Sequence, residues 1–259
     1  MLINNTQYGI ADLHMHTTVS DGTMSPQAVV NEILIQNLLA QRKGKGIVFD
    51  IIAVTDHDTI QGGLVAKNYL ADHYEYPDFQ IIIGAEVSSA DGHILGLHLT
   101  KNIAPHMSAE DTIRAIHDQG GIAIAAHPYS YIPFLKELKG IGKLIYNERV
   151  APYLDAVEIR NSNPTEIINN YIAQLVNYLH YKKPTCGGSD SHFQSAIGCT
   201  YTIFPGNTIE DLLSALKSGT TLAHGYVYGP LSVYSYLRDR LAWKHFCLED
   251  PIHRVFHDW

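Results

Sequence analysis

The sequence is poor in cysteine, in long apolar runs and in basic residues, and each shortage excludes a class of protein. The 259 residues include three cysteines, Cys186, Cys199 and Cys247, with neither Cys-x-x-Cys spacing nor an even count, so we expect no disulfide framework. No apolar stretch approaches the length of a membrane span, and residues 1–8 are polar rather than signal-like. We therefore expect a cytoplasmic protein with reduced thiols and no membrane partner.

The shortage of basic residues bears on the partners of the protein. Lysine and arginine total 18 against 26 acidic residues, the formal net charge is −8, and the single basic cluster is residues 42–45. An acidic surface repels a long polyanion, so long nucleic acid is not expected as a partner. A small phosphorylated molecule remains compatible, because bound metal ions can supply the positive charge that the surface lacks.

Short apolar runs alternate with helix-like segments along most of the chain. Ser25-Pro26 predicts a helix start and a helix to about Gln41, and Ser108 and Thr208 predict two further N-caps. The predicted strands, such as 47–54 and 122–126, are apolar on both faces, as buried parallel strands are. This alternation predicts an α/β fold with parallel strands, crossover helices and a closed or nearly closed barrel.

No linker or low-complexity stretch divides the chain, so residues 1–225 are expected to form one domain. Residues 226–259 differ, being rich in aromatic residues that include Trp243, Phe246, Phe256 and Trp259. We expect this extension to pack on the barrel, to cover the site or to form an interface, in which last case the protein would be a homo-oligomer.

The 15 histidines are the unusual feature of the composition, and several follow predicted strands. The polar residues at or after strand ends are His14, His16, Asp56, His57, Asp58, Glu86, His127, Asp190 and His192. In a barrel, the C-terminal ends of the strands converge on one mouth, where active sites lie. We therefore expect these side chains to meet.

Imidazole together with carboxylate is the donor set that suits Zn, Mn or Fe(II). His14 and His16 share one face of a strand because side chains alternate with a period of two, and Asp190 and His192 do the same. These two pairs and Glu86 exceed the four ligands of one tetrahedral ion. At least two divalent ions are therefore expected.

These residues stand in five motifs whose order resembles the PHP (polymerase and histidinol phosphatase) domain family. The motifs are Asp12-Leu-His14-Met-His16 through Asp21-Gly22, Thr55-Asp-His57-Asp58, Gly84-Ala-Glu86 with His93-Ile-Leu-Gly96, Ala126-His127-Pro128, and Gly188-Ser-Asp190-Ser-His192. They extend over residues 10–221, and the segments 197–200 and 208–219 resemble the C-terminal part of small PHP proteins. About thirty residues separate His93 from His127, so the chain resembles the short form without a helical cap insertion.

The resemblance implies a distorted (β/α)7 barrel, similar to a TIM barrel, with up to three metal ions at the C-terminal strand ends. The implied metal ligands are His14, His16, Asp21, His57, Glu86, His93, His127, Asp190 and His192. Glu86 is expected to bridge two ions, and His93 is preferred over His98 because it directly precedes Ile-Leu-Gly.

The expected activity is hydrolysis of a small phosphomonoester or nucleotide by attack of a metal-bridging hydroxide. Glu86, Asp190 and His192 are the expected catalytic residues. Arg160, which follows the predicted strand 156–159, is the candidate substrate-binding cation, because a guanidinium binds phosphate oxygens in a bidentate manner.

Three other functions fit the same residues. The first is exonuclease action on short oligonucleotides, and the second is a non-catalytic, metal-binding regulatory PHP module. The third is hydrolysis of a C–N bond, because histidine-rich barrels also perform amidohydrolase chemistry and a fold does not fix a function.

Overall fold

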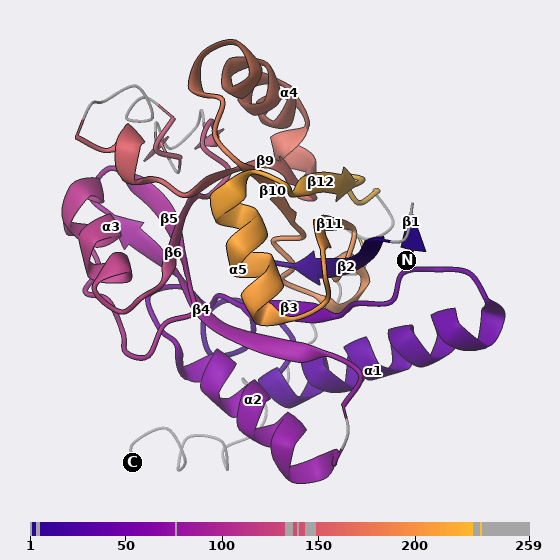
Figure 1. Cartoon of the computed structure of the whole chain (residues 1–259). Helices are drawn as coiled ribbons and strands as arrows, with labels where there is room; N and C mark the ends of the chain where they lie inside the picture. The colour runs from indigo at the N-terminus through magenta and orange to yellow at the C-terminus, as the bar shows by residue number, and fades with distance from the viewer. Residues whose placement is uncertain are drawn as a thin grey trace, which may run out of the picture.

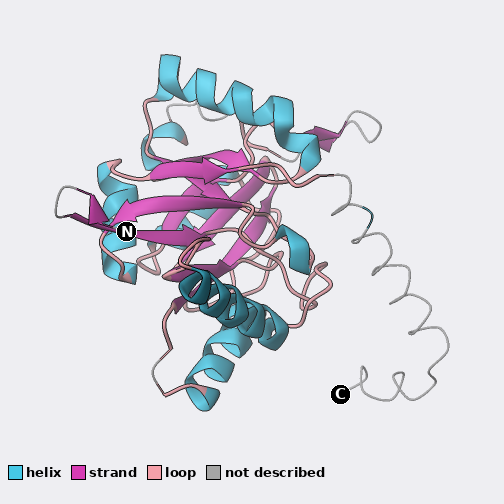
Figure 2. Cartoon of the chain, turned by 90° about the vertical axis from the view of Figure 1, so that its right-hand side faces the viewer, coloured by secondary structure: helices cyan, strands magenta, loops and turns pink. Residues whose placement is uncertain are grey.

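The computed structural model describes residues 2–3, 6–75, 77–132, 137–138, 140–142, 149–229 and 234. Its strands form a nearly closed, barrel-like sheet with helices around the outside (Figures 1 and 2). The strands are β1 (Leu2–Ile3), β2 (Thr6–Asp12), β3 (Ile51–Val54), β4 (Gln80–Ser89), β5 (Gly92–Leu97), β6 (Ile122–Ala125), β7 (Tyr131–Ile132), β8 (Glu137–Leu138), β9 (Ala156–Asn161), β10 (Thr185–Gly188), β11 (Thr200–Pro205) and β12 (Leu222–Gly225). The helices are α1 (Pro26–Lys43), α2 (Gln61–His73), α3 (Ala109–His117), α4 (Ile167–Val176) and α5 (Ile209–Ser218), with short turns η1 (Ala151–Tyr153), η2 (Pro164–Glu166), η3 (Asn177–Tyr181, a π-helix) and η4 (Gln194–Ala196).

The main sheet has the order β10-β9-β6-β5-β4-β3-β2-β11-β12, with β1 paired to β2. The predicted parallel pairing is present between β2 and β3, β3 and β4, β6 and β9, and β9 and β10. It is wrong for β5, β11 and β12, which run antiparallel to their neighbours. A two-residue turn, Ala90–Asp91, joins β4 to β5, and so short a connection allows only a hairpin.

Two strand boundaries also differ from the prediction. β4 extends to Ser89, so Glu86 lies within the strand rather than after it. β3 begins at Ile51 rather than residue 47, because the amide side chain of Asn37 bonds both to the N–H and to the carbonyl of Phe49 and so occupies its backbone groups. Apart from these boundaries, both strands lie where the sequence predicts them.

The three predicted helix caps are confirmed. The side chains of Ser25, Ser108 and Thr208 accept hydrogen bonds from the backbone N–H groups of Ala28, Asp111 and Asp211, respectively. At Thr208 the carboxylate of Asp211 also accepts from the N-cap N–H, which completes a capping box. These local signals fix where the helices that cover the sheet begin.

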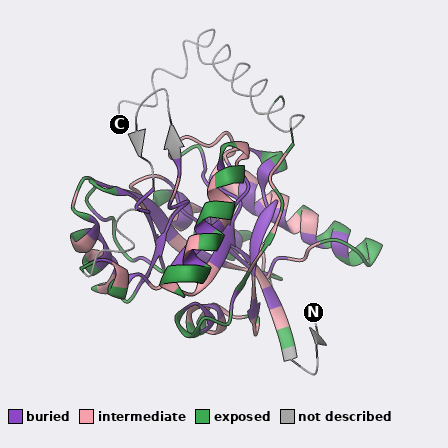
Figure 3. Cartoon of the chain, turned by 90° about the horizontal axis from the view of Figure 1, so that it is seen from above, coloured by how far each residue is buried: buried purple, intermediate pink, exposed green. Residues whose placement is uncertain are grey.

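The strands supply the centre of the core, and the helices cover it. All four residues of β3 and of β6 are buried, as expected for strands covered on both faces. Figure 3 shows the buried strands in the interior and the exposed residues gathered on the outer helices. Cys186 and Cys199 are free, buried thiols.

The described residues contain no helix that is both long and apolar enough to cross a membrane. The predicted role of the aromatic C-terminal extension concerns residues that, beyond Gly229 and apart from Tyr234, lie outside the described residues. Cys247, Trp243, Phe246, Phe256 and Trp259 are among these.

Candidate metal centre

At the mouth of the barrel, residues 14–16 lie beside residues 190–192. Met15 and Ser191 form a parallel bridge, in which His16 N donates to Ser191 O at 2.9 Å and Asp190 N donates to His14 O at 2.7 Å. The segments after β2 and β10 therefore run side by side. This pairing places the His-x-His and Asp-x-His motifs next to each other.

The structure brings all nine expected ligands into one cluster, with Glu86 at its centre. Oε2 of Glu86 lies 3.3 Å from Nε2 of His14, from Nε2 of His16 and from Nδ1 of His57. Oε1 lies 2.7 Å from Nδ1 of His93 and 2.8 Å from Nε2 of His127. The two oxygens of one carboxylate thus face different sets of histidines, an arrangement that suits a carboxylate shared by two ions.

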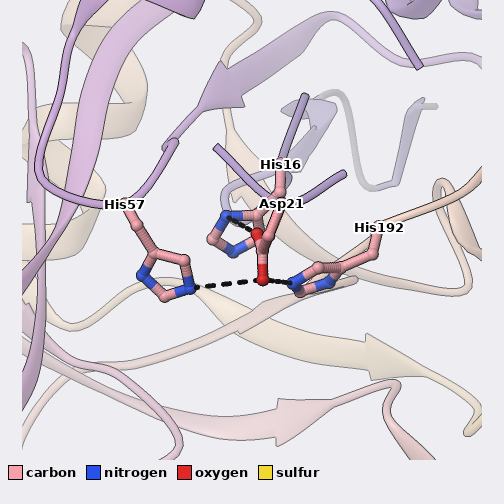
Figure 4. A group of neighbouring side chains, drawn as sticks. All are labelled: His16, Asp21, His57 and His192. Atoms are coloured by element: carbon pink, nitrogen blue, oxygen red, sulfur yellow. Dashed lines mark hydrogen bonds and ion pairs between the residues drawn. The ribbon is translucent and has the colours of Figure 1, made fainter. Parts of the chain in front are cut away.

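Two further carboxylates complete the cluster. Oδ1 of Asp190 lies 3.2 Å from Nε2 of His16 and 3.5 Å from Nε2 of His14. Oδ2 of Asp21 lies 3.2 Å from Nε2 of His192 and 3.8 Å from Nε2 of His57. Figure 4 shows Asp21 between the rings of His16, His57 and His192, which point toward it. His93 faces the cluster, whereas His98 is exposed.

The ligand atoms fall into three groups that are compact enough to hold an ion. The groups are His14, His16, Glu86 and Asp190; His16, Asp21, His57 and His192; and His57, Glu86 and His93. Within each group the donor atoms lie within 4.8 Å of one another. His16, His57 and Glu86 each belong to two groups, so neighbouring ions would share ligands.

The cluster also has buried polar atoms that need a partner. Nε2 of His14, both ring nitrogens of His16, Nδ1 of His57 and Nδ1 of His127 are buried without a hydrogen bond. Leaving such groups unpaired in the interior costs free energy. The nearest carboxylate oxygens of Glu86 and Asp190 lie close but without hydrogen-bond alignment. Lone pairs that converge without bonding one another fit a divalent cation between them.

The pKa values of the clustered residues also favour a bound cation. Burial by itself would lower the pKa of His16 and His127, but the carboxylates around them, Asp190 and Glu86 for His16 and Glu86 for His127, raise it to about 9 in each case. Burial would raise the pKa of Glu86 and Asp190, but the surrounding histidines hold both well below their usual range. The carboxylates are therefore anionic and attract positive charge, whether as protons or as metal ions.

Two of the clustered residues have strained backbones. His127 has φ +23° and Asp190 has φ +51°, a region that side chains other than glycine rarely adopt. Such strain persists only where the surrounding structure imposes it, and it concentrates at functional sites. Each lies two residues after the end of a strand, β6 or β10, and turns its side chain toward the cluster.

Glu158, a buried carboxylate on β9 directly behind the cluster, was not predicted from the sequence. Its Oε1 accepts from Nδ1 of His14 at 3.0 Å, and its Oε2 accepts from the N–H of His127 at 2.8 Å. Since Nδ1 of His14 carries the proton, Nε2 is free to donate its lone pair to a metal. A carboxylate within an otherwise apolar buried strand was the signal that could have revealed this residue.

Asp56 holds the loop that carries Asp21. It accepts from the N–H and hydroxyl of Thr17 and from the hydroxyl of Ser20, at 2.7 to 3.1 Å. A Cβ at Gly62 would lie 1.8 Å from Oδ2 of Asp56, so the close approach of α2 requires glycine there. Asp56 therefore supports the site without belonging to the three groups of ligand atoms.

Arg160, the candidate phosphate binder, lies on β9 two residues after Glu158. Its Nη1 donates to the carbonyl of Gly225 on β12 at 3.2 Å. This contact holds one of its five N–H donors at the backbone of the neighbouring strand. A role toward phosphate stays a prediction.

A separate cavity of about 570 Å³ lies between α1 and residues 193–199. Its described lining includes Lys43, Lys45, Gln194 and Tyr226, and it includes none of the nine clustered residues. Cavity volume and chemistry thus point to different places. We place the functional site at the cluster, because buried ionisable side chains that converge are typical of functional sites, whereas an open surface hollow is not.

A family model and a curated relative each match part of the chain. A family model described as PHP-associated matches residues 176–221, which include the predicted C-terminal segment. An uncharacterized protein of Methanocaldococcus jannaschii is 36% identical over 168 residues, covering 63% of this chain and 88% of its own length.

Two solved structures share the fold. PsfC from Pseudomonas syringae superposes with a TM-score of 0.65 at 17% identity, covering 91% of this chain and 99% of its own. A two-domain protein from Bacteroides vulgatus, described as containing a predicted PHP-like metal-dependent phosphoesterase, gives 0.63 at 18% identity, covering 87% of this chain and 67% of its own. With five motifs in order, a matching family model and this barrel, the chain belongs to the PHP domain family.

Proposed function

We propose that the protein is a metal-dependent phosphoesterase that hydrolyses a small phosphorylated molecule. The observation that supports this most is the convergence of five histidines, Asp21, Glu86 and Asp190 in three overlapping ligand groups, with a sixth histidine, His127, against Glu86. Imidazole and carboxylate donors suit Zn, Mn or Fe(II). Two or three such ions would supply Lewis acidity and would lower the pKa of a water toward neutrality.

Hydrolysis adds water across an ester bond of phosphorus. A new P–O bond forms from the water oxygen, the bond to the leaving oxygen breaks, and that oxygen takes up a proton. The residues of the chain would divide this task by their burial. Glu86 and Asp190 are buried and anionic, so they would hold cationic charge in place against the phosphoryl oxygens.

The substrate would enter from the exposed side of the cluster. The side chains of Asp21, His57 and His192 are 42%, 26% and 20% exposed, whereas those of His14 and His16 are 0% exposed. His192 borders this opening and contacts Asp21, which agrees with the catalytic role predicted for it. Arg160 stays the proposed cation for the phosphate group.

The acidic net charge of −8 favours a small phosphorylated substrate over a polymer. A direct test compares an aryl phosphomonoester, an aryl phosphodiester, a short oligonucleotide and a set of amides, with added Mn²⁺ and after chelation. We expect phosphomonoester hydrolysis that disappears with chelator. Metal-dependent cleavage of the oligonucleotide alone would favour the exonuclease, and amide hydrolysis alone would reject the proposal.

The same assay on variants assigns the activity to this site. His14→Ala and Asp190→Ala each remove a ligand and should abolish activity, with the fold retained. His73→Ala is the matched control, because His73 is an exposed imidazole on α2, outside the cluster. Full activity in either ligand variant, with metal content unchanged, would contradict the proposal.

A further inference from the structure

α4 presents an apolar stripe to the solvent. Ile168, Tyr171 and Leu175 on α4 and Tyr178 on η3, which directly follows it, are 70%, 72%, 57% and 78% exposed, and we call these four residues the α4 stripe. Their spacing of three, four and three residues places them on one side of a helix, as in the seam of a helix pair. Residues 167–179 contain no charged side chain.

The rest of α4 shows that this exposure is unusual in the molecule. Ala173 is its single buried residue, whereas α5, of the same length, buries Leu212, Ala215 and Leu216. α1 also exposes some apolar side chains, but it packs a full inner face against the core. α4 lies at the top of Figure 1 and faces the viewer in Figure 3, where its ribbon is coloured mainly as exposed. A contiguous apolar surface of this kind marks an interaction site.

The chain itself offers an occupant, because its C-terminal extension departs from the body close to α4. The N–H of Tyr228 donates to the carbonyl of Ser162 at 3.0 Å, and Ser162 lies five residues before α4 begins. Tyr234 lies five residues after Gly229. Five residues of extended chain span at most about 17 Å. This limit applies both to the stretch from Ser162 to the start of α4 and to the stretch from Gly229 to Tyr234, so the extension can reach the start of α4.

The extension, like the stripe, carries apolar side chains at a helical spacing. Residues 230–259 contain Tyr234, Leu237, Leu241 and Leu248, with spacings of three, four and seven residues, which are also typical of one helix face. Tyr234 is 67% exposed. A segment tethered beside its target is present at millimolar effective concentration, so even modest apolar contacts suffice for docking.

We propose that residues 230–259 dock on the α4 stripe of their own chain. The docked segment would cover Ile168, Tyr171, Leu175 and Tyr178 along one side of the helix. A second copy of the chain is the rival occupant, since the same stripe could pair with itself. This inference does not depend on the proposed activity.

Photo-cross-linking of the full-length chain separates these occupants. The chain carries p-benzoylphenylalanine in place of Tyr171, or in place of Ile35 on α1, which is also exposed, as the matched control. Labelled (¹⁵N) and unlabelled chains are mixed before irradiation, and cross-linked peptides are identified by mass spectrometry. We expect cross-links from position 171 to residues 230–259 of the same chain, at least about tenfold more abundant than from position 35.

Cross-links that join labelled to unlabelled chains, or that come mainly from position 35, would overturn the proposal, as would none to residues 230–259. A second pair of variants tests the stripe itself. Leu175→Asp should reduce the cross-link at position 171 severalfold, whereas Gln174→Asp, which places the same charge beside the stripe on an exposed polar residue, should not. Equal losses in both variants would also reject the stripe as the docking surface.

Discussion

The inner and outer halves of the metal centre are built differently. We call the buried half the floor, and the half whose side chains are 15% to 42% exposed the rim. The floor consists of His14, His16, Glu86, His127 and Asp190, and the rim consists of Asp21, His57, His93 and His192. Strand ends carry most of the floor, whereas Asp21 of the rim lies on a loop.

The difference lies in how firmly each half is fixed. Glu158 bonds to both His14 and His127, and Asn161 bridges Glu158 to Asp190, so the floor is held by a buried network. Asp21 depends on a loop that is anchored through Asp56. Preorganised ligands lose less entropy on binding. The floor should therefore bind an ion tightly, and the rim should bind a more exchangeable one.

The largest effect is expected from Glu86→Gln. The substitution removes the charge that faces five imidazoles, and with it the ligand shared between floor and rim. Activity should fall by more than about a hundredfold, since residues that merely support a ligand already cost roughly 10–100-fold. Metal analysis should show loss from both halves. If the variant kept its full metal content, Glu86 would not be a ligand that floor and rim share.

Lowering the pH should weaken the floor before the rim. The pKa values of His16 and His127 are raised to about 9, so at neutral pH a metal ion must displace a proton from each, whereas burial lowers the pKa of His57. Apparent affinity at the floor should fall about tenfold per pH unit for each displaced proton as the pH drops from 9 toward 6. Calorimetric titration in buffers of different ionisation enthalpy measures the protons released. No proton release at pH 7 would contradict the raised values.

Glu158→Gln should weaken metal binding by about 10–100-fold without unfolding the protein. The carboxylate accepts at both oxygens, and an amide offers one acceptor, so either His14 or His127 loses its partner. Metal affinity, measured by titration, should drop together with activity. Glu166→Gln is the control, because this buried carboxylate accepts from Ser130 and lies outside the cluster. Equal metal affinities in the two variants would show that Glu158 does not support the floor.

Asp21→Asn should have a smaller effect, of about tenfold, confined to the rim. Asp21 contacts His192, His57 and His16, and its side chain is 42% exposed, so water can replace part of its role. Metal analysis after brief chelation should show loss of one ion with the floor ion retained. Simultaneous loss of every ion would mean that floor and rim bind as one unit.

Arg160→Met should give the smallest change in the site. If the guanidinium binds the phosphate group, KM should rise by about three- to tenfold with kcat nearly unchanged, as expected for one charge-assisted hydrogen bond that forms alike in the ground and transition states. An unchanged KM with a lower melting temperature would instead assign Arg160 to its contact with the Gly225 carbonyl.

Much of the metal centre and of the helix boundaries was predictable because their determinants are local in the sequence. His14 and His16, like Asp190 and His192, stand two residues apart after apolar runs, and a strand period of two directs both members of each pair to one side. The helix caps at Ser25, Ser108 and Thr208 are equally local. Such signals come from residues that are close in the chain, so they can be recognised without knowledge of the fold.

The two missed features, Glu158 and the direction of β5, escaped for different reasons. Glu158 gains its role from His14, 144 positions away, and no local pattern reveals that pairing. The antiparallel β5 depends on the turn at Ala90–Asp91, where a hairpin replaced the expected crossover. Periodicity identifies a strand but not the direction of its neighbour.

The bridge between Met15 and Ser191 has a consequence for the order of events during synthesis. Asp12 bonds to the N–H of Ser189 across 177 positions, and Asp21 meets His192 across 171. Seven of the nine clustered residues lie within the first 127 positions of the chain, whereas Asp190 and His192 are added only when about three quarters of the chain has been made. The complete cluster can therefore form only after residue 192 has been made, and an ion held by ligands from both segments would stabilise the closure of a very long loop.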